Sequence, residues 1–294
     1  MPVTRVGRVR RQLLLALSVV GAGCSPDPGR VHAPDPLRIV SLVPAATGML
    51  VELGLADRVV GRTLDDRTPG AGEAQPVGRV LTPDLEAVVG LAPDLVLAWV
   101  GAPYLPALER LSAPVGARVL ALDLDRLDRV APEWIRVADA AGAPGRGRHA
   151  AAGLQASLDS LRRTRAGRRT IRVLWIVGDE PPVAVGPGSF LADLLDAVGA
   201  VNVLSGAGSA WPAVGFETLS ARDPDLILWG APQPPPRADA HPWSTVAAVR
   251  DGRVLRLDPD RVHEPGPGIA AVAVELAALI DAGSLPANSI GILP

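Results

Sequence analysis

The sequence predicts an α/β protein of two lobes with parallel sheets, joined by one long backbone helix. Strand-like apolar runs alternate with helical segments over residues 37–143 and again over 170–283, the pattern of parallel βαβ units. Between them, residues 144–169 lack strand signals, and leucines recur there at helical spacing. The two halves also repeat one another, which indicates duplicated Rossmann-like units.

The first lobe begins with an apolar strand expected over 37–43, followed by a helix over 45–53. Gly54 stands where a left-handed residue commonly ends a helix. A second strand over 58–61 leads into a polar loop, and a buried strand is expected over 95–99. These elements supply two successive βαβ units.

A further helix is expected to begin at the sequence Thr82-Pro83-Asp84. In this interpretation Thr82 is the N-cap, Pro83 is the first helical residue, and Asp84 belongs to an acidic first turn. The helix should end near Pro93, since proline does not continue a helix.

The internal repeat is clearest around two glutamates. Glu86 stands before a Pro-Asp-Leu triplet and a tryptophan, and Glu217 precedes the same triplet by the same interval, again with a tryptophan after it. The matching residues are Pro93-Asp94-Leu95 with Trp99, and Pro224-Asp225-Leu226 with Trp229. Two such lobes face each other across a cleft, where ligands usually lie.

The first 24 residues are typical of a secretory signal peptide. Arginines precede a short apolar run, which is followed by small residues before Cys24, the single cysteine. Residues 25–36 are rich in proline and predict an extended tether, and 284–294 form a tail. Cys24 resembles the lipidated cysteine of bacterial lipoproteins, although Gly21 stands where Leu or Val is usual. An ordinary signal peptide cleaved elsewhere is the alternative.

Composition excludes several functions. A net charge of −2 argues against a nucleic-acid partner. All 29 basic residues are arginine, so lysine-dependent chemistry is excluded. No three-ligand metal site is expected, because the four histidines are scattered: His32, His149, His241 and His263.

An exported enzyme of the α/β hydrolase kind is the main alternative from another class. Such an enzyme needs a nucleophile elbow of the G-x-S-x-G type, which the sequence lacks. We therefore expect no catalytic residues and no cofactor. A cell-surface scaffold lipoprotein is a third alternative.

Five segments in order resemble the binding proteins of ABC importers for cobalamin, iron-siderophores and haem, in particular the cobalamin-binding branch. They are RIVSLVPAAT (38–47), VGRVLTPDLEAVVGLAPDLVLAW (77–99), GPGSFLADLL (186–195), WPAVGFETLSARDPDLIL (211–228) and LDPDRVHEPGP (257–267). The resemblance implies a monomer that captures a small ligand between its lobes. Its partners would be an ABC permease and its ATPase, with membrane contact only through the lipid anchor.

The resemblance also implies roles for particular residues. Glu86 and Glu217 match the two glutamates that dock into arginine pockets of the permease. Trp99 and Trp211 match aromatic residues of the cleft, and Asp260 matches a cleft acid. Arg261 and His263 lie beside Asp260 and could reach a metal-bound or anionic group.

The expected ligand is a cobalamin-like corrinoid, with a ferric siderophore or haem as the alternative. Three aromatic positions of the branch are occupied here by Asp65, Val80 and Val183. The loss of these rings leaves fewer stacking surfaces, and Asp65 becomes a candidate polar contact. An anionic siderophore would be repelled by Asp65 and Asp260 unless Arg62 and Arg261 neutralise them.

Overall fold

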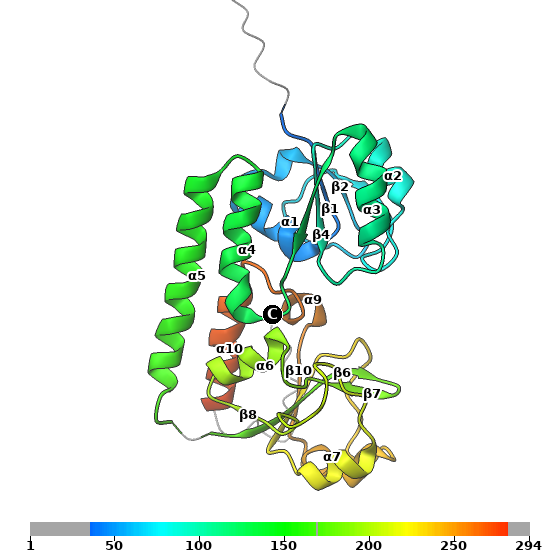
Figure 1. Ribbon diagram of the computed structural model, residues 1–294. Coiled ribbons are helices and arrows are strands. Elements are labelled where there is room, and N and C mark those ends of the chain that lie inside the picture. Colours follow the sequence, from blue (N-terminus) through cyan, green and yellow to red (C-terminus); the bar gives the residue numbers. More distant parts are fainter. Residues whose placement is uncertain (1–35, 169, 282–294) are drawn as a thin grey trace, which may run out of the picture. The chain divides into compact units, whose positions relative to one another are not determined.

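The computed structural model describes residues 36–168 and 170–281 (Figure 1). The predicted signal peptide, the lipidation at Cys24 and the 284–294 tail lie outside these residues, as does all of the tether except Pro36. The helices and strands in chain order are β1 (Ile39–Ser41), α1 (Pro44–Glu52), β2 (Val59–Arg62), β3 (Gln75–Pro76), α2 (Leu85–Gly90), β4 (Leu95–Trp99), α3 (Leu105–Ser112), β5 (Arg118–Leu122), α4 (Leu127–Ala140), α5 (Pro144–Arg165), β6 (Arg172–Asp179), β7 (Pro182–Ala184), α6 (Phe190–Ala197), β8 (Val201–Asn202), α7 (Phe216–Arg222), β9 (Leu226–Trp229), α8 (Ala247–Arg250), β10 (Val254–Arg256), α9 (Pro259–Val262) and α10 (Ile269–Asp281).

The first sheet has the order β3-β2-β1-β4-β5, and every pair in it is parallel. Side chains of β4 alternate between two apolar clusters, as the two-residue period of a strand requires. Leu95 and Leu97 pack on the cluster that contains α1 and α4, while Val96 and Ala98 pack on the cluster with α2 and α3. Both faces of the sheet are therefore covered, which explains why its strands are almost wholly apolar.

The second sheet has the order β10-β9-β6-β7, with β8 also paired to β6. β8, β9 and β10 run parallel to their neighbours, but β7 is antiparallel to β6. The sequence predicted parallel sheets in both lobes and did not include this hairpin. Only Glu180 and Pro181 separate the two strands, and so short a connection can join only antiparallel neighbours.

The predicted linking helix is α5. It ends at Arg165 rather than at 169, and it begins with a proline at its first turn, where the missing amide hydrogen is not needed. It lies beside α4 (Figure 1). Gly147 of α5 faces Ala138 of α4 so closely that there is no room for a side chain on Gly147. One apolar cluster runs through β1, β4, α4, α5, β6 and α6, so the two lobes share a core.

The chain crosses between the lobes a second time after α9. Gly266 packs against Ala45 of α1, and Pro267 packs against Gly48. α10 then runs along α5. Asp281 at the end of α10 forms ion pairs with Arg165 and with the exposed Arg168. This return segment lies at the cleft and brings second-lobe residues onto the first lobe.

The N-terminus of α2 differs from the sequence prediction. Asp84, not Thr82, is the N-cap, and its carboxylate accepts hydrogen bonds from the backbone amides of Glu86 and Ala87 at 3.1 and 3.0 Å. Pro83 forms an isolated bridge with Gly78 and is not helical. A carboxylate that can accept two amides is a stronger cap than a hydroxyl, which moves the helix start by two residues.

The repeat predicted from the sequence is visible in the backbone. Gly54 after α1 has φ of 64°, and Gly199 after α6 has φ of 73°. Each glycine leads to a strand beside the first strand of its sheet, β2 beside β1 and β8 beside β6. Within the described ranges, no helix is both long and apolar enough to cross a membrane.

Candidate functional site

A cavity of about 710 Å³ lies where the carboxyl ends of the parallel strands of both sheets meet. The first lobe contributes the last residue of β4 and residues that follow β1 and β5, together with Asp65 and Val80 from the loops around β3. The second lobe contributes the start of α6, the loop before α7, and the segment after β10. This edge is where open α/β sheets bind their ligands.

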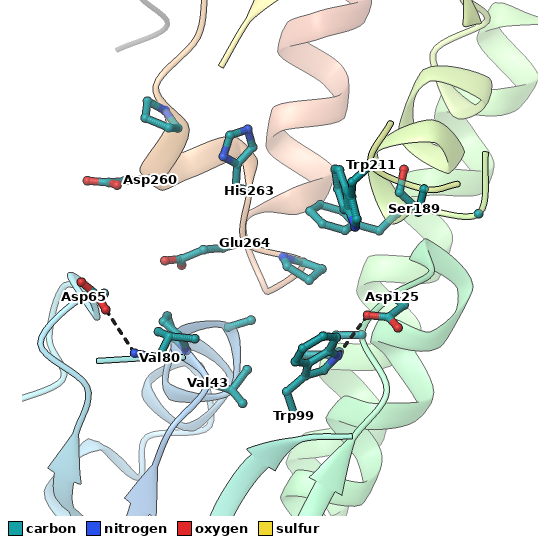
Figure 2. A pocket seen from close by; sticks show the side chains of 18 residues that line it. Val43, Asp65, Val80, Trp99, Asp125, Ser189, Trp211, Asp260, His263 and Glu264 are labelled. Atoms are coloured by element: carbon teal, nitrogen blue, oxygen red, sulfur yellow. Dashed lines mark hydrogen bonds between the residues drawn. The ribbon is translucent and has the colours of Figure 1, made fainter. Parts of the chain in front are cut away.

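Trp99 and Trp211 both line the cavity, one from each lobe (Figure 2). Trp99 is the last residue of β4, and its indole Nε1 donates a hydrogen bond to Oδ1 of Asp125 at 3.0 Å. Trp211 is 45% exposed, and its ring has no aromatic partner among the described residues. Two indoles of this kind can stack on a flat ligand.

Ser189 and Phe190 line the cavity at the N-terminus of α6. Ser189 is the N-cap of this helix, and its hydroxyl accepts a hydrogen bond from the amide of Ala192 at 3.2 Å. Neither residue was among the site residues predicted from the sequence, although the segment that contains them carried part of the resemblance. A serine that follows a glycine and precedes an apolar run is typical of a helix N-cap. This pattern could have placed Ser189 and Phe190 at the start of a helix.

Two of the predicted site acids already have arginine partners. Asp65 accepts hydrogen bonds from Arg79 at 2.6 Å and from the amide of Val80 at 3.1 Å. Asp260 lies 3.4 Å from Arg67 in an exposed ion pair. Both acids line the cavity, as does Val80, whereas Val183 lies in β7 outside the lining.

Arg261 does not line the cavity. Its guanidinium contacts both carboxylate oxygens of Glu275 in α10, at 3.1 and 3.2 Å. Residues 260 and 261 are neighbours at the start of a helical turn, so their side chains point in different directions. The structure therefore separates Arg261 from the group of predicted ligand contacts.

His263 lines the cavity, but its Nε2 atom is buried and has no hydrogen-bond partner within the described chain. This atom lies close to Gly230, where a Cβ would come within 2.7 Å of it, and the Nε1 atom of Trp175 lies on the same side. Burial lowers the pKa of His263 to about 4, against a smaller opposing effect of Asp258. The imidazole is therefore neutral at physiological pH, and its Nε2 is buried against Gly230.

Glu264 lies in the cavity and was not selected by the sequence analysis (Figure 2). Burial, followed by the nearby carboxylates of Asp66 and Asp260, raises the pKa of Glu264 to about 7. The described chain offers it no arginine partner. Only the return of the chain toward α1 creates this environment, so no local sequence signal marked it.

We expect Glu264→Gln to stabilise the protein above neutral pH. Glu264 ionises near pH 4.5 in an unfolded chain and near 7 in the folded protein, so the folded state binds the extra proton between these values. The stability that this group contributes therefore falls as pH rises from 4.5 to 7, by about 2 kcal/mol after a reduction for partial exposure. Denaturant unfolding of variant and parent at pH 4.5 and at pH 8 measures this change in the free energy of unfolding.

The difference between variant and parent should be small at pH 4.5 and largest at pH 8. Glu73→Gln, in an exposed loop, is the matched control for the loss of one carboxylate. Equal stability of Glu264→Gln and parent at pH 8 would contradict this assignment.

Glu86 and Glu217 lie away from the cavity, each exposed in the first turn of a short helix, α2 and α7. The two helices occupy equivalent places before β4 and β9 in the two lobes. No group of three or more potential metal-ligand side chains occurs within residues 36–168 and 170–281.

Two lobes, a joining helix and a cleft at the carboxyl edges of the strands are the architecture of a solute-binding protein. The chain belongs to the periplasmic binding protein family, whose model matches residues 39–261. It is 26% identical over 235 residues to the vitamin B12-binding protein of Vibrio cholerae, covering 78% of this chain and 84% of that one. It is 27% identical over 258 residues to the vitamin B12-binding protein of Pectobacterium carotovorum, covering 86% and 92%.

Solved structures share the fold. The periplasmic vitamin B12-binding protein of Vibrio cholerae matches with a TM-score of 0.70 at 24% identity, over 83% of this chain and 96% of that one. The periplasmic haem-binding protein of a Roseiflexus species matches with a TM-score of 0.71 at 25% identity, over 84% and 99%. The predicted fold class and the family resemblance are both confirmed.

Proposed function

We propose that this protein is the extracytoplasmic solute-binding protein of an ABC importer, and that its ligand is a cobalamin-like corrinoid. The observation that carries the proposal is the placement of Trp99 and Trp211, from opposite lobes, in one cavity of about 710 Å³. Each well-placed ring contributes about 0.5–1.5 kcal/mol beyond the burial of area. A corrinoid is a large flat ligand that suits such walls.

The charges of the cleft support a ligand without net negative charge. The ionised groups among the described lining residues are carboxylates, and no arginine lines the cavity. Asp65 and Asp260 are paired with Arg79 and Arg67, which do not line it. Haem carries two carboxylates and many siderophores are anionic, so both would meet repulsion from Asp125 and Glu264, which have no arginine partner within the described chain.

A ferric siderophore or haem is the second candidate ligand. It is favoured by the fold, because haem-binding proteins match the chain as well as the vitamin B12-binding protein does in TM-score. We further propose that Cys24 is lipidated and anchors the protein to the membrane. Cell fractionation of a Cys24→Ala variant would test the anchor.

Titration of tryptophan fluorescence tests the ligand proposal. Cyanocobalamin should quench the parent saturably, and Trp99→Ala and Trp211→Ala should each weaken binding by about tenfold, because each removes a stacking surface. Trp134→Phe, at a buried position of α4 outside the cavity, is the control. Saturable quenching by haemin or a ferric siderophore, with none by cyanocobalamin, would refute the corrinoid assignment.

A further inference from the structure

The Trp99 indole is held from two sides. Its Nε1 donates to Oδ1 of Asp125 at 3.0 Å (Figure 2). The ring also lies against Gly101, where a Cβ would come within 2.5 to 2.8 Å of three ring atoms. The indole N–H is thus used within the protein, and these two contacts hold the ring in one orientation.

The loop that carries Asp125 is tied to the second lobe. Two guanidinium nitrogens of Arg126, Nε and Nη2, each donate a hydrogen bond of 2.7 Å to the carboxylate of Asp193. The backbone amide of Leu127 donates to the same carboxylate at 3.0 Å. Asp193 lies in the first turn of α6, next to the cavity wall formed by Ser189. The bidentate ion pair of Arg126 with Asp193 fixes direction as well as distance, so the neighbouring Asp125 has a defined place between the lobes.

The second carboxylate oxygen of Asp125 remains available. Asp125 is exposed and lines the cavity, and within the described chain Oδ2 has no hydrogen-bond partner. An ionised carboxylate only accepts hydrogen bonds. Any group that meets Oδ2 at the edge of a ring stacked on Trp99 must therefore be a donor.

We propose that Asp125 is a specificity-determining residue of the cleft, which accepts a hydrogen bond from an N–H donor at the edge of the ligand while it holds the Trp99 ring. The inference rests on the proposed function and narrows the ligand to molecules with peripheral amide or amine groups. A corrinoid carries such carboxamides around its ring, whereas the polar edge of haem carries carboxylates, which cannot donate when ionised.

Asp125→Asn separates the two roles. The amide oxygen of asparagine can still accept from the Trp99 indole, but its NH₂ group places donors where the ligand donor would come. Cyanocobalamin should bind this variant about tenfold more weakly than the parent. Asp125→Ala should lose both roles, and its Trp99 indole N–H signal in the nitrogen-15 spectrum should move, whereas that of Asp125→Asn should stay near the parent position.

Corrinoids with one peripheral carboxamide hydrolysed to a carboxylate provide the decisive arm. These monocarboxylate isomers are separated and tested one by one. One of them should bind Asp125→Asn better than it binds the parent, because its carboxylate, an acceptor, then meets the NH₂ group of the asparagine, a donor. Asp128→Asn, which removes a nearby charge outside the cavity, should bind every probe as the parent does.

The outcomes distinguish this inference from the function on which it rests. Saturable binding of cyanocobalamin by the parent with unchanged affinity in Asp125→Asn overturns the role of Asp125 alone. Binding of haemin as the single active probe overturns both the corrinoid assignment and the donor requirement. No binding of cyanocobalamin, haemin or ferric desferrioxamine overturns the proposed capture function, and this inference with it.

Discussion

A protein carrying Glu86→Arg and Glu217→Arg should bind cyanocobalamin as the parent does and yet fail to support its uptake. Both glutamates are exposed in the first turns of α2 and α7, outside the cavity. Close charge pairs across protein interfaces couple by about 1.5–7 kcal/mol, and reversal turns attraction into repulsion. Uptake should therefore fall by tenfold or more for each reversal, and further for both.

Two quantities are measured. One is the uptake of labelled cyanocobalamin by a strain of the source organism that lacks the native copy, and the other is the affinity of the purified variants for cyanocobalamin. Glu109→Arg in α3 and Glu180→Arg in the β6–β7 turn reverse other exposed glutamates, one in each lobe, and serve as matched controls. Weakened ligand binding in either docking variant would place that glutamate in the ligand site. Normal uptake by the double variant would refute docking through these residues.

Gly147→Ala should destabilise the protein, while Gly153→Ala in the same helix should stabilise it. A Cβ on Gly147 would lie 2.1 Å from the Cβ of Ala138, and neither atom can move without its helix. Separating α4 from α5 should cost about 1–3 kcal/mol net, since overpacking outweighs the gain in helix propensity.

Gly153 is the matched position, because it is exposed and has nothing within 4 Å of its Cβ site. Alanine there should add about 0.5–1 kcal/mol through helix propensity alone. Denaturant unfolding of both variants measures the change in the free energy of unfolding, which should be negative for Gly147→Ala and positive for Gly153→Ala. A stable Gly147→Ala variant would show that the contact between α4 and α5 can relax.

Local periodicity was enough to predict several elements of the first lobe, up to β4. The strand expected over 95–99 is β4 (Leu95–Trp99), and the helix expected over 45–53 and the strand expected over 58–61 agree with α1 and β2 within one residue. These segments are apolar runs bounded by proline and glycine, so their conformation depends on near neighbours in sequence. The start of α2 was misplaced because Asp84 competes successfully with Thr82 as a cap, a choice that depends on loop geometry.

The candidate site was predicted only in part. Trp99, Trp211, Asp65, Asp260 and His263 line one cavity, but Arg261 pairs with Glu275 on the far side of its helical turn. Asp125 and Glu264 were missed, because each depends on a partner that is distant in sequence. Asp125 follows β5 at the carboxyl edge of the sheet, and that position was the one signal that could have marked it.

By itself the sequence determined the α/β class, the two repeated lobes, the linking helix and the family, since these follow from periodicity and ordered motifs. Only the tertiary structure decided which side chains face the cleft and in which protonation state. The return of 263–268 onto α1 buries Glu264 beside other carboxylates, and the Arg126–Asp193 pair fixes the loop of Asp125. Both effects arise because desolvation and ion pairing depend on residues far apart in the chain.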